Sequence, residues 1–134
     1  MTIEKDDPLP LRTGEDVVRI RQSVRARALE IGFRLVDVTK LVTAASELAR
    51  NTVTHGGGGV ARLEVVANGA RRGLRVVFED KGPGITDVER ALQDGFTTGG
   101  GLGLGLGGAR RLCHDFEILS RVGEGTRVAI ARWI

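Results

Sequence analysis

The sequence predicts a two-layer α/β (α+β) sandwich, in which helices cover one face of a mixed, largely antiparallel sheet. Two N-terminal segments carry apolar residues every three or four positions, which is typical of amphipathic helices. Two later segments, 60–79 and 116–133, each hold a pair of apolar-rich stretches around a glycine-containing turn, which indicates hairpins. A short helix and a glycine-rich segment separate those hairpins, so the order of elements is mixed.

The length of 134 residues fits one domain, expected over 1–134 with 1–12 as a tail, because that segment holds three acidic residues and two of the three prolines. Hydrophobic residues make up 41% and charged residues 28%, which favours a folded globule over a disordered chain. No apolar run is long enough to span a membrane and no signal peptide is evident, so we expect a cytoplasmic protein without a membrane partner.

Charge and cysteine content exclude several function classes. The 20 basic and 17 acidic residues give a mixed surface, and only 4% of residues are aromatic, so we expect no nucleic-acid partner. A single cysteine, Cys113, excludes a disulfide within the chain and is expected to pack on a helix face. With two histidines in all, a multi-histidine metal site is not expected.

The first helix is expected to begin after Thr13, which forms a capping pair with Asp16, and to run to about Gly32. Its apolar stripe recurs at spacings of three and four: Val17, Ile20, Val24, Ala28 and Ile31. Four arginines on the other faces indicate a solvated surface or, as the alternative, a face that binds a partner: Arg19, Arg21, Arg25 and Arg27.

A second helix is expected to follow Asp37, a residue type that favours the N-cap position. Its stripe is the most regular in the chain: Val38, Leu41, Val42, Ala45, Leu48, Ala49 and Thr52. Glu47 and Asn51, four residues apart, are neighbours on a face roughly opposite that stripe. The four glycines at 56–59 end the helix.

The remaining elements follow from turn and cap signals. Strands are expected over 60–67 and 74–79, with a turn at Asn68-Gly69 between them. Thr86 and Glu89 have the spacing of a capping box, which predicts a short helix closed by Gly95. A further helix should contain Ala109, Leu112 and Cys113, and a last hairpin should turn at Gly123-Glu124-Gly125.

An aspartate with two glycines follows the first predicted hairpin, in the order Asp80-Lys81-Gly82-Pro83-Gly84. One carboxylate can point at a ligand while the glycines let the backbone pass close beside it. A carboxylate accepts from an exocyclic amino group, so Asp80 would favour adenine over guanine. An ordinary Asp-Gly turn is the alternative interpretation.

A second motif is the glycine-rich segment 99–108, which leads into a helix. Its backbone amides, including those of Gly99 and Gly105, can approach phosphate oxygens, and the helix N-terminus adds aligned donors. The segment matches neither a Walker A motif nor a dinucleotide fingerprint. A flexible loop is the alternative.

The third motif is Glu47 with Asn51. An asparagine carbonyl oxygen can bind magnesium beside nucleotide phosphates, and a carboxylate one turn earlier could accept a proton from an incoming hydroxyl. Two polar residues on a solvated helix face are the alternative.

Together, the order Glu-x-x-x-Asn, Asp-x-Gly-x-Gly, Gly-x-Gly-x-Gly and Gly-Thr resembles the gyrase/histidine-kinase (GHKL) ATPase superfamily over about residues 37–133. The resemblance implies its Bergerat-type ATP-binding fold with ATP and magnesium as cofactors, and a short ATP lid over 96–100. The residue roles it implies are Asn51 as magnesium ligand, Asp80 as adenine reader, Gly82 and Gly84 beside the base, Gly101, Gly103 and Gly105 at the phosphates, and Thr126 at the adenine end.

A narrower resemblance rests on the strings 46–51, 79–85, 94–103 and 131–133, which are similar to those of RsbT-type serine kinases, the switch kinases of the bacterial stressosome. It implies phosphoryl transfer from ATP to a serine or threonine of a STAS-domain protein, with Glu47 as the candidate base, followed by activation of a PP2C-type phosphatase. The segment 95–105 departs from the expected charge pattern because it contains no Lys or Arg. An RsbW-like anti-sigma factor kinase and an ATP-gated binding module are the alternatives.

Overall fold

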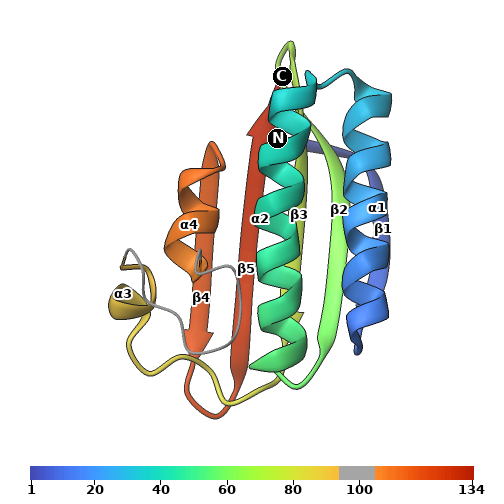
Figure 1. Ribbon diagram of the computed structural model, residues 1–134. Helices are drawn as coiled ribbons and strands as arrows, with labels where there is room; N and C mark the ends of the chain where they lie inside the picture. The colour runs from blue at the N-terminus through green and yellow to red at the C-terminus, as the bar shows by residue number, and fades with distance from the viewer. Residues whose placement is uncertain (94–104) are drawn as a thin grey trace.

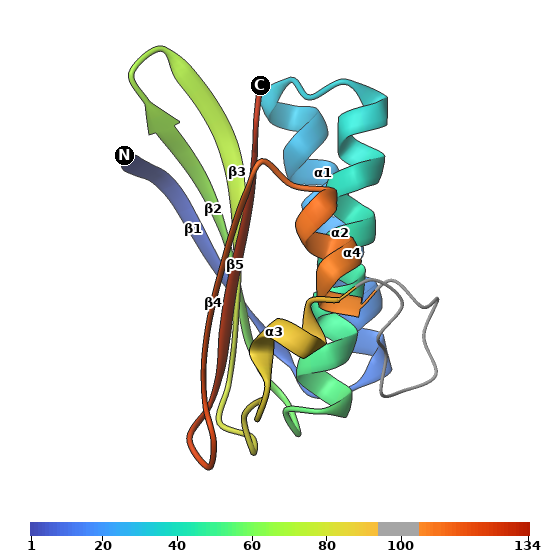
Figure 2. The same ribbon diagram turned by 90° about the vertical axis from the view of Figure 1, so that its left-hand side faces the viewer.

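The computed structural model describes residues 1–93 and 105–134, which form two layers. In Figure 1 the sheet lies behind the helices, and in Figure 2 the same sheet is seen edge-on with all the helices on one side. The elements in chain order are β1 (Thr2–Leu11), α1 (Gly14–Ile31), α2 (Leu35–Thr54), β2 (Gly59–Asn68), β3 (Arg71–Asp80), α3 (Val88–Ala91), α4 (Gly105–Arg111), β4 (Asp115–Arg121) and β5 (Gly125–Trp133).

The sheet has the strand order β1-β2-β3-β5-β4, and every pairing between the described strands is antiparallel. The predicted two-layer α/β class is therefore confirmed, although the sheet is antiparallel rather than mixed. Alternate residues of the strands face the helices and join their apolar stripes in one core, which includes Ile20, Leu41, Val76 and Ile130, each with no exposed surface.

The predicted tail is wrong, because Thr2–Leu11 forms the edge strand β1 against β2. Pro8 and Pro10 are compatible with this place, since an edge strand has a neighbour on one side only. Its acidic residues find basic partners, with Asp6 accepting from Arg62 at 3.0 Å and Asp7 from Arg27 at 2.5 Å. The backbone pairing with β2 therefore holds this strand, and the charges that resemble a solvated tail pair with β2 and α1.

The starts of α2 and α3 differ from the predictions, because their N-caps are other residues than expected. Thr13 and Asp16 form the expected capping box, but α2 begins after Arg34 without a side-chain cap. Asp37 instead accepts from Arg132 Nη2 at 2.7 Å, which joins α2 to β5. At α3 the N-cap is Asp87 rather than Thr86, with its carboxylate accepting from a backbone N–H.

The helix α4 ends at Arg111, so Leu112 and Cys113 lie just beyond it rather than within it. Gly95, expected to close α3, lies outside the described residues. Among the described helices none combines the length and apolarity that crossing a bilayer requires.

Candidate nucleotide-binding site

A cavity of about 700 Å³ opens among the C-terminal half of α2, the ends of β3 and β5, the loop after β3, and helices α3 and α4. This volume falls within the range of small-molecule sites. Its wall is apolar along one side, from Leu48, Phe78, Ile85, Leu106 and Val128. The polar groups on the wall come from separate parts of the chain, among them Glu47, Asn51, Asp80, Thr126 and Gly105. The Asp80 motif and the Glu47–Asn51 pair therefore meet in one cavity with Gly105, which belongs to the described part of the glycine-rich segment.

Asp80 ends β3 and is held by two glycines. Its Oδ1 accepts from the Gly82 N–H at 2.9 Å, and Oδ2 accepts no hydrogen bond from the described residues. A Cβ on Gly56 would fall 2.4 Å from the Asp80 Cγ, so the backbone after α2 lies directly against the carboxylate. The carboxylate is thereby fixed on the cavity wall with an acceptor oxygen available for a ligand donor.

The other residues predicted at the adenine end lie around Asp80 in different ways. Thr126 is its partner across the β3–β5 pairing, lines the cavity, and shares a hydrogen bond with Ser120 at 2.8 Å. Gly84 also lines the cavity, and its φ of +78° suits glycine. Gly82 is not a lining residue, because it packs against the Gly56 backbone and orients Asp80.

Glu47 and Asn51 both line the cavity, as their spacing predicts. The solvated-face interpretation is wrong for Glu47, whose exposed fraction is only 6%. Its Oε1 accepts from the Gly105 N–H at 3.3 Å, and its Oε2 lies 3.5 Å from Arg50 Nη1. Helix α4 packs on α2 and covers this face, so the carboxylate lies between the two helices.

The glycines predicted at the phosphates are described only in part. Gly105 is buried at the start of α4, beside Glu47. Gly99, Gly101 and Gly103, and the expected lid at 96–100, lie outside the described residues. Close packing explains the glycine at position 107. A Cβ there would lie 2.2 Å from the Leu92 carbonyl oxygen, where α4 approaches the end of α3.

Sequence reasoning missed Gly56 and Arg50 as parts of the site. The run of glycines at 56–59 indicated a helix end, and only the fold shows that Gly56 packs on Asp80. Arg50 stands within the Glu-x-x-x-Asn motif, so the motif itself was the available signal. The apolar wall residues belong to ordinary core patterns and carried no separate signal.

Cys113 and His114 lie away from the cavity. Burial raises the pKa of the Cys113 thiol to about 12, and the side chain packs against the core as predicted, although from the residues after α4 rather than from a helix face. His114 Nδ1 accepts from the Trp133 N–H at 2.9 Å. Burial, with the positive charge of Arg132, lowers the pKa of His114, which favours the neutral ring.

Comparison with known proteins assigns the architecture and the motifs to one family. Residues 36–133 match the family model of histidine kinase-, DNA gyrase B-, and HSP90-like ATPases. The chain is 44% identical over 124 residues to the serine/threonine-protein kinase RsbT of Bacillus subtilis, covering 92% of this chain and 93% of that protein. It is 30% identical over 119 residues to an anti-sigma F factor of Anoxybacillus flavithermus, covering 84% and 80% of the two chains.

A solved structure supports the fold. The crystal structure of the RsbU and RsbW domains of a Mycobacterium tuberculosis protein matches with a TM-score of 0.68 at 22% identity, over 96% of this chain and 32% of that one. The family match spans both predicted ligand motifs and the helix that carries Glu47 and Asn51. The chain therefore belongs to the histidine kinase-, DNA gyrase B-, and HSP90-like ATPase family and, within it, to the RsbT-like serine/threonine protein kinases.

Proposed function

We propose that the protein transfers the γ-phosphate of ATP to a serine or threonine hydroxyl of a STAS-domain antagonist or scaffold protein. The observation that carries the proposal is the buried Glu47 carboxylate. It lines the same cavity as Asn51 and as Asp80, the carboxylate that we assign to the adenine amino group. Nucleotide binding alone does not need a carboxylate at this position, whereas transfer to a hydroxyl gains from a positioned base. The similarity to the serine/threonine-protein kinase RsbT supports transfer to a serine or threonine of a protein.

The adenine end selects the nucleotide in this proposal. Asp80 Oδ2 accepts from the adenine amino group, Thr126 assists the same edge, and Gly84 gives the base room against the loop backbone. Apolar side chains such as Phe78 and Ile85 exclude water around the ring. The cavity has the volume and the acceptor that a purine nucleotide requires.

The phosphate end fits magnesium through Asn51, whose half-buried side chain is an oxygen donor on the cavity wall and receives no hydrogen bond from the described residues. When bound there, Mg²⁺ would neutralise phosphate charge. Gly99, Gly101 and Gly103 would give backbone N–H groups to the phosphate oxygens, and the Gly105 N–H would do so by exchanging Glu47 Oε1 for a phosphate oxygen.

Glu47 would act on the attacking hydroxyl. The hydroxyl oxygen forms a bond to the γ-phosphorus while the bond from that phosphorus to the β,γ-bridging oxygen breaks, so ADP leaves with the bond electrons. The hydroxyl proton passes to a Glu47 carboxylate oxygen. Burial between α2 and α4 keeps bulk water from competing for that proton.

We place this transfer in a cytoplasmic partner switch of the stressosome type, in which the kinase, once its antagonist is phosphorylated, is released to activate a PP2C-type phosphatase. The RsbW-like alternative is an anti-sigma factor that also sequesters a sigma factor, and the similarity to anti-sigma F factors favours keeping it. Sigma-factor binding in a pull-down separates the two functions, because only the alternative requires it.

The test is Glu47→Gln, which keeps an oxygen for the Gly105 N–H but cannot take up a proton at neutral pH. Transfer of labelled phosphate from ATP to candidate STAS proteins should fall roughly 10²- to 10⁴-fold, without weaker ATP binding. Glu117→Gln, on the exposed face of β4, is the matched control and should transfer at the wild-type rate. Undiminished transfer by the Glu47 variant would remove this carboxylate from the mechanism.

A further inference from the structure

The terminal phosphate of ATP needs positive charge, and the segment expected over the phosphates supplies none from side chains. Residues 94–105 contain no Lys or Arg, so the only donors in that segment are backbone amides and the hydroxyls of Thr97 and Thr98. Kinase and ATPase sites normally add Lys or Arg to the metal at the transferring phosphoryl group. A side-chain cation should therefore come from another wall of the cavity.

Three basic side chains line the cavity among the described residues: Arg50, His55 and Arg90. His55 caps the C-terminus of α2 beside Gly56, which packs on Asp80, and so lies toward the adenine end. Arg90 lies on α3 and has another interaction of its own. Arg50 lies on α2 between Glu47 and Asn51 in sequence, which is the phosphate end of the proposed site.

The Arg50 guanidinium has donors to spare. Its closest acidic partner is Glu47, with Nη1 3.5 Å from Oε2, which is too long for a bidentate pair. A guanidinium carries five N–H donors in a planar fork, so one edge can face Glu47 while the other faces a second anion. Its side chain is 39% exposed, whereas that of Glu47 is 8% exposed, so Arg50 lines the cavity beside the buried carboxylate and remains accessible to a ligand.

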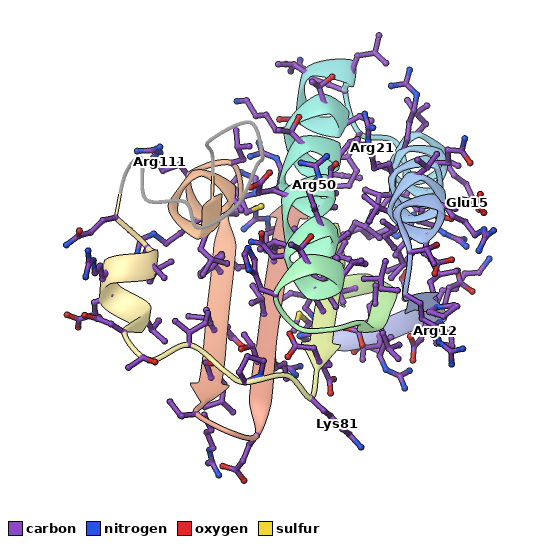
Figure 3. All side chains as sticks on the ribbon, turned by 60° about the horizontal axis from the view of Figure 1, so that its bottom comes forward. Arg12, Glu15, Arg21, Arg50, Lys81 and Arg111 are labelled. Carbon is purple, nitrogen blue, oxygen red and sulfur yellow. The ribbon has the colours of Figure 1, made fainter. Side chains whose placement is uncertain are left out.

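Figure 3 shows Arg50 on α2, between α1 and α4, while Arg12, Lys81 and Arg111 extend from other elements toward the periphery. The last three do not line the cavity. Of the arginines that the figure labels, Arg50 is thus the one on the cavity wall.

The negative charges expected at the phosphate end account for a cation at position 50. A triphosphate at this end would bring its terminal anionic group near the Glu47 carboxylate, and like charges at short range repel. A guanidinium between the two anions offsets this repulsion, because it attracts both the carboxylate and the phosphate. It would also fix the carboxylate relative to the phosphorus that the hydroxyl attacks.

We propose that Arg50 bridges the Glu47 carboxylate and the γ-phosphate of bound ATP, and so makes the site discriminate a nucleoside triphosphate from a diphosphate. The inference rests on the proposed function, because it assigns the γ-phosphate to the Glu47 end of the cavity. Arg50 is a substrate-binding residue toward the phosphate and a positioning residue toward Glu47.

The test compares nucleotide affinities of the full chain by calorimetry, with Mg²⁺ present throughout. The probes are ADP and the ATP analogue that carries NH in place of the β,γ-bridging oxygen. Arg50→Gln should weaken binding of the analogue by roughly 10- to 100-fold, the effect of losing a charge-assisted hydrogen bond, while ADP affinity stays within about twofold. Arg50→Lys should recover part of the analogue affinity, since it keeps the charge but loses the fork.

Arg25→Gln on the exposed face of α1 is the matched control and should bind both nucleotides as the wild type does. The γ-phosphate contact would be overturned if Arg50→Gln bound the analogue as tightly as the wild type does. It would also be overturned if the variant lost as much affinity for ADP as for the analogue. A slower phosphoryl transfer with an unchanged analogue-to-ADP ratio would likewise reduce Arg50 to a positioning residue for Glu47. Absence of nucleotide binding in the wild type would instead refute the proposed function. Thermal melts confirm that each variant is folded.

Discussion

The substitution Gly56→Ala should weaken ATP binding while leaving the chain folded. Gly56 is not among the glycines with positive φ, so alanine can adopt its backbone conformation. The added methyl group would lie 2.4 Å from Asp80 Cγ, 2.5 Å from Oδ2 and 2.7 Å from Cβ. The methyl group thus collides with the carboxylate that we assign to adenine.

The size of the effect follows from those distances. Ordinary carbon contacts begin near 3.5 Å, so the Asp80 carboxylate must retreat by about 1 Å. The surrounding backbone cannot easily yield instead, because the Gly56 N–H donates to the Asn51 carbonyl at 3.1 Å and its carbonyl packs on Gly82. A displacement of this size breaks a hydrogen bond, which for a charged acceptor is worth about 1.5–3 kcal/mol, or roughly 10- to 150-fold in Kd.

Calorimetric titration with ATP and a thermal melt give the two readouts. Gly56→Ala should also lose about 1–3 kcal/mol of folding stability, the usual result of overpacking. Gly14→Ala is the control, since a Cβ at Gly14 meets no atom within 4 Å and its φ is not positive. Wild-type ATP affinity in folded Gly56→Ala would refute the assignment of Asp80 as the adenine acceptor.

Three further predictions test other parts of the molecule. Asp80→Asn should weaken ATP binding by about 1–3 kcal/mol and reduce the preference for ATP over GTP, because an amide can present a donor to the adenine amino group; competition between the two nucleotides measures this. Asn51→Ala should abolish magnesium-dependent nucleotide binding, so a titration that responds equally to Mg²⁺ in variant and wild type would contradict its role as a ligand. Cys113 should resist alkylation by iodoacetamide at pH 8 in the folded protein and react after unfolding, because burial raises the pKa of its thiol to about 12 and leaves little thiolate; mass spectrometry of the labelled protein decides.

The elements that the sequence predicts well are those whose signal is local. The stripe from Val17 to Ala28 and the capping box at Thr13 define α1 without reference to the rest of the chain. The Asn68-Gly69 turn likewise defines the β2–β3 hairpin, because both strands are adjacent in sequence. Periodicity and turn chemistry act over a few residues, so they can be read from a single segment.

The elements that it misses depend on partners far away in the chain. Residues 2–11 become β1 because they pair with β2 along its length and bury Leu11, while Arg62 and Arg27 pair with Asp6 and Asp7, and no pattern within the segment shows these partners. Asp37 has the residue type of an N-cap but pairs with Arg132, 95 residues later. In each case an aspartate whose residue type favours solvent or a helix N-cap instead forms an ion pair with an arginine that is distant in sequence.

Glu47 shows the same limit at the site itself. The angle between Glu47 and the apolar stripe follows from 100° per residue in an α-helix. What that face meets does not follow, because Gly105, whose N–H the carboxylate accepts, lies 58 residues further along. A helical position opposite the stripe would normally be solvated, and here α4 covers it. Burial of a carboxylate is costly without a partner, so the contacts with Gly105 and Arg50 are what make this position tenable. A ligand that competes for either contact must therefore act on Glu47 as well, which ties binding at the phosphate end to the state of the proposed base.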